Sequence, residues 1–129
     1  MEYSIEYDPA ACMLTARVQG AWSWIAAFDA GRSLREAVAA RHARSVLIDL
    51  REVVGLDLRT LSMYELASRL VAGRRQFAHI AAKGAFVVPD LGPEGDVHYQ
   101  YFENTSRNRG LPYRLFKDVE QARQWLRGG

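Results

Sequence analysis

The sequence predicts an α/β fold with a mixed, mainly parallel five-stranded sheet and about four helices, in the order β-β-α-β-α-β-α-β-α. Three observations predict this fold. Two short runs that alternate apolar and polar residues open the chain. Two continuous apolar runs of strand length follow them. Segments with apolar residues at helical spacing separate these runs and follow the last ones, and such alternation requires crossovers between parallel strands.

The first two strands are predicted to form an antiparallel hairpin. Residues 3–8 and 12–20 both alternate, and residues 8–11, Asp-Pro-Ala-Ala, are typical of a turn. Two alternating runs joined by a short turn indicate a hairpin. The residues that share its apolar face are Tyr3, Ile5 and Tyr7 in the first run and Leu14, Ala16 and Val18 in the second.

The middle of the chain is predicted to alternate helix and strand. Ser23 suits the N-cap of a helix that runs to about His42. Residues 45–50, "SVLIDL", contain an unbroken Val-Leu-Ile run, which indicates a strand buried on both faces. A second helix is expected from Leu58 to about Phe77, because its apolar residues recur at helical spacing.

The last third of the chain is predicted to repeat this pattern. Residues 83–89 form a second buried strand, and Asp96 is predicted to cap a third helix that ends near Asn108. A short strand is expected at 113–116. Residues 118–121, Asp-Val-Glu-Gln, have the form of a capping box that opens a last helix. The residues expected in the core are Ile48, Val87, Phe116 and Trp125.

Composition indicates an ordinary globular domain. The 129 residues are 49% hydrophobic and 25% charged, so we expect a single domain over 1–129 with a real core. No apolar run is long enough to span a membrane. The N-terminus has no pattern of a signal peptide, and the single cysteine, Cys12, cannot form an intrachain disulfide. These features predict a cytoplasmic protein.

The loop at 49–62, "DLREVVGLDLRTLS", is predicted to lie at the functional edge of the sheet. Sites on such sheets lie beyond the carboxyl ends of the strands. Asp49 and Asp57 could form a carboxylate pair for acid–base chemistry or for a metal. A strand-end acid and a helix N-cap explain them better, because no nucleophile, base or third ligand lies beside them in the sequence. We therefore expect no catalytic set, no metal site and no cofactor.

Two other groups of residues have a functional and a structural interpretation. Trp22 and Trp24 flank Ser23 and could form an apolar ligand pocket or a partner surface, or they could pack in the core. We expect one to point inward and the other to be exposed. Several arginines could contact nucleic acid, but acids are interleaved with them and the net charge is only +2. A solvated mixed surface is the better interpretation, so nucleic acid is not expected as a partner.

Three segments of the chain resemble one family. They are the opening hairpin, the segment 45–57, "SVLIDLREVVGLD", and the closing segment 108–126, "NRGLPYRLFKDVEQARQWL". With these segments, nearly the whole chain resembles the STAS domains, the fold of the anti-sigma factor antagonists. It is most similar to the bacterial SpoIIAA-like proteins, many of which have no assigned function. The resemblance implies a single STAS-like domain.

The resemblance also bears on a phosphorylation switch. Switchable STAS proteins carry an Asp-Ser-Ser-Gly-type sequence at the start of the second helix, where a partner kinase phosphorylates the second serine. On this chain Asp57 matches the aspartate, Leu58 and Arg59 fall at the serines, and Thr60 falls at the glycine. The chain therefore lacks the usual phosphoacceptor. Thr60 and Ser62 retain hydroxyls, for which helix capping is the expected role.

We therefore expect a non-catalytic regulatory or protein-interaction module whose partner resembles a kinase or an anti-sigma factor. A homodimer is also expected, because the sheet has an exposed edge. The alternatives are a domain that binds a small apolar or anionic ligand, with an apolar pocket at Trp22 and Trp24, and, last, an enzyme. The predicted partner-binding residues are Arg51, Asp57, Arg59, Thr60, Ser62 and Glu65.

Overall fold

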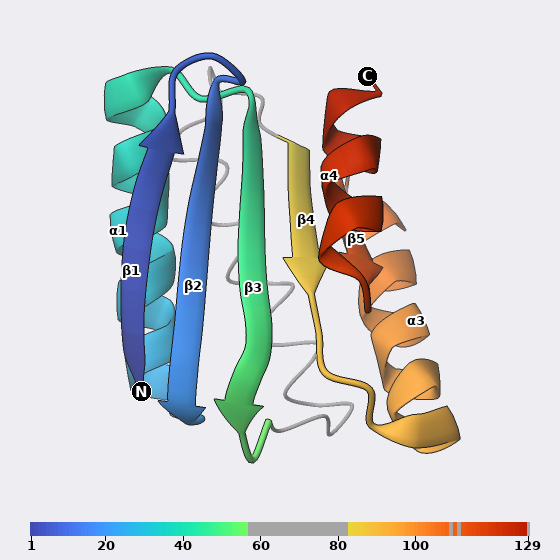
Figure 1. The fold of residues 1–129 in the computed structure, drawn as a ribbon. Coiled ribbons are helices and arrows are strands. Elements are labelled where there is room, and N and C mark those ends of the chain that lie inside the picture. Colours follow the sequence, from blue (N-terminus) through green and yellow to red (C-terminus); the bar gives the residue numbers. More distant parts are fainter. Residues whose placement is uncertain (57–82, 109, 111, 129) are drawn as a thin grey trace.

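The structure is a computed structural model that describes residues 1–56, 83–108, 110 and 112–128 (Figure 1). Its elements, in chain order, are β1 Glu2–Asp8, β2 Met13–Ala21, α1 Trp24–Arg41, β3 Ser45–Val54, β4 Lys83–Val87, α3 Gly92–Asn108, β5 Tyr113–Phe116 and α4 Val119–Arg127. The helix expected at Leu58 to Phe77 lies outside the described residues. The described elements otherwise follow the predicted order.

The five strands form one sheet in the order β1-β2-β3-β4-β5, so each strand pairs with the one before it in sequence. β1 and β2 are antiparallel, and the three other pairs are parallel. This confirms the predicted mixed, mainly parallel sheet. The register is irregular at one place, because the four residues of β3 from Asp49 to Glu52 oppose the three residues of β2 from Arg17 to Gln19.

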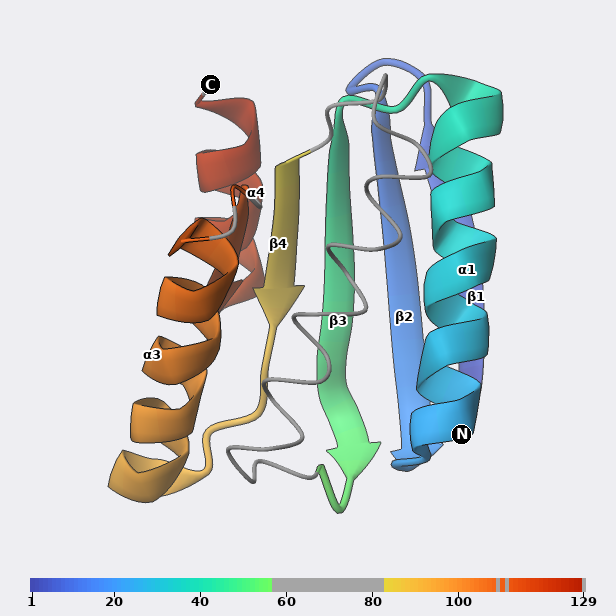
Figure 2. The ribbon, with the colours of Figure 1, turned by 180° about the vertical axis from the view of Figure 1, so that it is seen from behind.

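Helices cover the two faces of the sheet unequally. α1 and α3 lie on one face and α4 lies on the other, as the two opposite views show (Figures 1 and 2). α4 contacts β3, β4 and β5. The half of that face formed by β1 and β2 is not covered by any described helix.

Because side chains alternate between the two faces of each strand, the apolar residues on one face are placed together and can pack against a helix. On the α1 face, Leu14 and Ala16 of β2 and Val46 of β3 pack with Leu34 and Val38 of the helix. All five are at least 92% buried, and each of the leucine and valine side chains contributes about 1.5–3 kcal/mol by its burial. The predicted hairpin face is confirmed, because Ile5 and Tyr7 pack against the same cluster.

A second core cluster lies under α4. Leu47 and Val87 of the sheet, both almost fully buried, pack against Ala122 and Leu126 of the helix. The predicted core residue Val87 is confirmed. The other three expected core residues are half-buried, because they lie at the margins of the two clusters: Ile48, Phe116 and Trp125.

Two predicted helix caps are confirmed. Ser23 accepts a hydrogen bond from the backbone N–H of Ala26 at 3.3 Å, and α1 ends at His42 in a left-handed conformation. Asp118 accepts the backbone N–H groups of Glu120 and Gln121 at 2.7 and 3.3 Å. Both caps satisfy donors that the first helical turn leaves unpaired.

The predicted start of the third helix is wrong by one turn. α3 begins at Gly92 rather than beside Asp96. Asp90 accepts the backbone N–H of Gly92 at 3.0 Å, and Pro93 follows, where proline is favoured because its missing N–H is not needed. Asp96 instead pairs with Lys117 at 2.7 Å, which links α3 to the segment before α4. None of the described helices is long and apolar enough to cross a membrane.

Candidate partner-binding edge and polar groove

The carboxyl ends of the parallel strands form one edge of the molecule, at the bottom of Figure 1. The backbone N–H of Trp22, just after β2, donates to the carbonyl of Val54 at the end of β3, at 2.8 Å. Across the sheet, the N–H of Val88 donates to the carbonyl of Phe116, also at 2.8 Å. These bonds hold the strand exits together, so that the segments leaving them start from fixed positions.

Exposed apolar side chains gather around these exits. Ile25 in the first turn of α1 is 79% exposed, and Val54 at the end of β3 is 68% exposed. Leu91 and Val97, in the β4–α3 loop and the start of α3, are 45% and 69% exposed. Single exposed apolar residues are common. These four lie at the end of β3 or in the segments that follow β2 and β4.

The two tryptophans at this edge contact each other. Their rings pack edge to face with centroids 5.2 Å apart, and the ring centroid of Trp24 lies 5.6 Å from that of Phe28. Both are half-buried, so the expectation of one inward and one exposed tryptophan is wrong. Ser23 is the N-cap and has extended backbone, so Trp22 lies outside the helix and the two rings are not separated by helical geometry. A ligand pocket at these rings stays a prediction.

Arg51 is held in place by a carboxylate of its own strand. Asp49 accepts hydrogen bonds from the backbone N–H, Nε and Nη2 of Arg51 at 3.1, 3.0 and 2.8 Å. These bonds, chiefly those of the guanidinium, hold the pKa of the Asp49 carboxyl below its ordinary value. Asp49 and Arg51 are two residues apart in β3, so ordinary strand alternation places both side chains on the same side of the sheet. The remaining predicted partner-binding residues lie outside the described residues: Asp57, Arg59, Thr60, Ser62 and Glu65.

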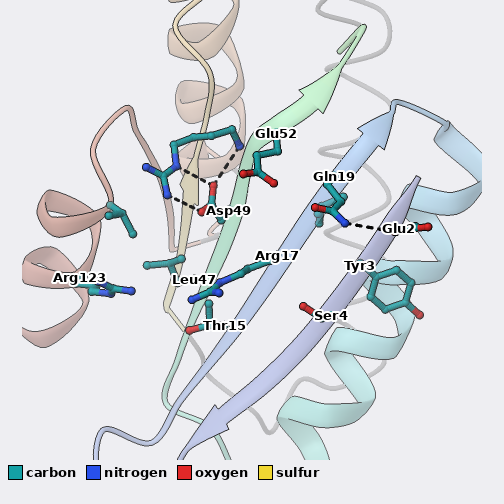
Figure 3. A pocket seen from close by; sticks show the side chains of 13 residues that line it. Glu2, Tyr3, Ser4, Thr15, Arg17, Gln19, Leu47, Asp49, Glu52 and Arg123 are labelled. Atoms are coloured by element: carbon teal, nitrogen blue, oxygen red, sulfur yellow. Dashed lines mark hydrogen bonds and ion pairs between the residues drawn. The ribbon is translucent and has the colours of Figure 1, made fainter.

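A polar groove of about 500 Å³ lies on the uncovered half of the sheet, between β1, β2 and α4 (Figure 3). Leu47 lies at its floor, and α4 forms one wall with Val119 and Arg123. Its polar lining comes from strand residues that alternate except at the register shift of β3, where Arg51 and Glu52 are adjacent: Glu2, Ser4, Thr15, Arg17, Gln19, Asp49, Arg51 and Glu52. None of these strand residues except Arg51 was predicted as a site residue.

Charge is distributed unevenly along this polar groove. The guanidinium groups of Arg17 and Arg123 point toward one another from β2 and α4 (Figure 3). Glu2 and Glu52 lie toward the start of β1 and the end of β3, where they also border a second hollow with Gln19. The groove therefore has a cationic end beside α4 and an acidic end at the start of β1.

No metal site is formed by the part of the chain that the structure describes. No group of three or more His, Cys, Asp or Glu side chains lies close enough there to bind an ion. Cys12 is half-buried, and its thiol donates to the carbonyl of Pro9 at 3.7 Å. Its backbone φ of 51° places it in the turn between β1 and β2.

Comparison with solved structures identifies the architecture. An anti-sigma factor antagonist from Mycobacterium paratuberculosis superposes over 98% of this chain and 95% of its own, with 17% identity and a TM-score of 0.58. The anti-sigma factor antagonist SpoIIAA in its unphosphorylated form superposes over 99% and 98%, with 13% identity and a TM-score of 0.61. The chain has the SpoIIAA-like fold. No protein-family model and no curated protein matches the sequence.

Of the two surfaces, the sequence predicted the strand-exit edge but not the polar groove. The edge at the strand exits was predicted, because β-α alternation locates it. The polar groove was missed, although a signal was present. Thr15, Arg17 and Gln19 alternate with the apolar residues of β2, which shows that one side of this strand is polar. That α4 would border this side without covering it depends on contacts far apart in sequence.

Proposed function

We propose that this protein is a non-catalytic bacterial regulatory module that acts in the cytoplasm by binding another protein at the strand-exit edge. The observation that carries the proposal is the gathering of exposed apolar side chains at that edge. Ile25 lies in the segment that follows β2, and Val54 lies at the end of β3; both side chains are more than half exposed. A partner that covers such side chains removes their apolar surface from water, which favours binding.

The likeness to two anti-sigma factor antagonists over the full chain supports the kind of partner. We propose an anti-sigma factor or a related kinase. The resemblance of the sequence to the switchable family members puts Arg59 where a phosphoacceptor serine is expected. We therefore also propose that binding does not depend on phosphorylation there. Arg59, together with Asp57, Thr60, Ser62 and Glu65, is proposed to complete the surface that begins with Arg51.

The test uses purified anti-sigma kinases encoded in the same genome, each titrated against the immobilised protein. Val54→Lys should weaken the binding about tenfold or more, because it places a charge at a desolvated contact. The side chain is 68% exposed, so the free energy of unfolding should change by no more than about 0.5 kcal/mol. Tyr101→Lys is the matched control, since Tyr101 lies in the middle of α3 and is 36% exposed.

A second pair of variants tests the charged part of the surface. Arg51 and Arg32 are both exposed and both pair with an aspartate, at 2.8 and 2.9 Å. Arg51→Glu should weaken partner binding, whereas Arg32→Glu on α1 should not. If all four variants bind equally well, or if no kinase of the genome binds, the partner-binding edge is not as proposed.

Self-association is a separate proposal. Among the described strands β1 pairs only with β2, so the outer edge of β1 could pair with a second copy of the chain. We propose a homodimer, which light scattering at high concentration would detect. A strict monomer at millimolar concentration would exclude it.

A further inference from the structure

The polar groove carries an inference that is independent of the partner-binding edge. We propose that its cationic end binds the phosphate or carboxylate head of a small organic anion between Arg17 and Arg123. The floor and walls of this site are described residues of β2, β3 and α4. The groove volume of about 500 Å³ is within the range of small-molecule sites.

The guanidinium of Arg17 has hydrogen-bond donors that no described residue uses. Among the described residues it has no hydrogen-bond or ion-pair partner, although it stands beside Asp49 in the sheet register. Asp49 is engaged by three hydrogen bonds from Arg51. Arg17 lies close enough for its charge to help lower the pKa of the Asp49 carboxyl, but its own N–H donors are not used by that carboxyl. A guanidinium carries five N–H donors in a planar fork, which matches the two oxygens of a carboxylate or phosphate.

Arg123 is positioned to complete the site from the opposite wall. Its Nη1 donates to Glu120 at 2.8 Å, which fixes the side chain and leaves most of its N–H donors unused. It is only 31% exposed. Because the two guanidinium groups point toward one another, an oxyanion between them would receive donors from both sides (Figure 3). The hydroxyl of Thr15 and the apolar floor at Leu47 border the same space.

The acidic end of the groove restricts the size of the anion. Glu2 and Glu52 would repel a second negative group placed there. A long polyanion such as nucleic acid would extend over these carboxylates, whereas a molecule with a single oxyanion head need not. The chemistry of the site therefore fits a small phosphate ester or carboxylate, and not a nucleic acid.

The experiment follows arginine side-chain N–H signals by NMR as inorganic phosphate, and separately acetate, is added at constant ionic strength. The Nε signals of Arg17 and Arg123 should shift and saturate, and that of Arg32 on the other face should not. Comparison of the two probes shows whether the site prefers a tetrahedral or a planar head. Arg17→Gln should weaken the saturable binding about tenfold, since it removes a charged hydrogen-bond donor.

Matched variants decide between the site and a general surface effect. Arg32→Gln removes an exposed arginine from α1 and should leave phosphate and acetate binding unchanged. Shifts at Arg17 that stay linear with concentration, or that equal those at Arg32, would overturn the proposal. A short DNA duplex that perturbs Arg17 and Arg123 more strongly than phosphate would also overturn it. Because no protein partner is added, failure here leaves the proposed partner-binding edge untouched.

Discussion

Replacing Gly84 with alanine should destabilise the protein through a clash with one aromatic ring. Gly84 lies in β4 opposite Tyr113 of β5. A Cβ added at Gly84 would stand 2.6 Å from Cδ1 and 2.8 Å from Cε1 of that ring. These distances are well inside van der Waals contact, and both atoms belong to a rigid ring. Tyr113 must therefore rotate or move away from the sheet.

The size of the effect follows from what the ring would lose. Tyr113 packs edge to face with Phe86 at 5.7 Å, a kind of contact that contributes about 0.5–1.5 kcal/mol. Overpacking at a well-filled site costs about 1–3 kcal/mol. We expect Gly84→Ala to lower the free energy of unfolding by about 2–3 kcal/mol. In urea denaturation, that corresponds to a midpoint lower by about 1–2 M.

Two comparisons isolate the clash. Gly31→Ala is the matched control, because its Cβ would meet only the Arg35 side chain, at 3.4 Å, within a helix where alanine is favoured. In a Tyr113→Ala background, Gly84→Ala should cost less than about 0.5 kcal/mol, because the ring is gone. An equal cost of Gly84→Ala in both backgrounds would refute the reasoning.

The remaining predictions concern a buried hydroxyl and a helix cap. Burial raises the pKa of Tyr99 to about 12, and its hydroxyl donates to the carbonyl of Pro89 at 2.8 Å. Because the folded pKa exceeds that of the unfolded chain, stability present below pH 10 should be lost as the pH rises toward 12. In chemical denaturation, the free energy of unfolding of Tyr99→Phe should fall less steeply between pH 10 and 12 than that of the unmodified protein. A steeper fall would contradict this. Asp118→Ala removes the cap of α4 and should lower stability by about 1 kcal/mol, which thermal melting against Asp118→Asn would measure.

Local patterns were sufficient for most of the fold. The hairpin, the two buried strands and the caps at Ser23 and Asp118 each depend on neighbouring residues, and the structure confirms them. The predicted start of α3 was wrong, although it too depends on neighbouring residues. Asp90 accepts the backbone N–H of Gly92, whose φ of 78° forms the turn at which α3 begins. Asp96 therefore lies inside the helix, and the position of this turn is not evident from the two acids alone.

The polar groove could not be predicted in this way. Its strand residues are visible in the alternation of β2, but its wall is Arg123 of α4, more than a hundred residues along the chain from Arg17. Where α4 docks is set by the packing of Leu126 and Ala122 over Leu47. Such a contact depends on side-chain shape at long range, so the sequence pattern alone does not locate it. The position of the strand-exit edge could be predicted from the order of strands and helices alone.

The strand order β1-β2-β3-β4-β5 also bears on how the protein is made. Each strand pairs with one synthesised before it, so the sheet can grow from its first hairpin while the chain leaves the ribosome, at about 5–20 residues per second. The cluster around Leu47 and Val87 behaves differently, because Ala122 and Leu126 arrive last. Until α4 docks, a nascent chain presents an apolar sheet face to its neighbours, and this is the stage at which chaperones would be needed most.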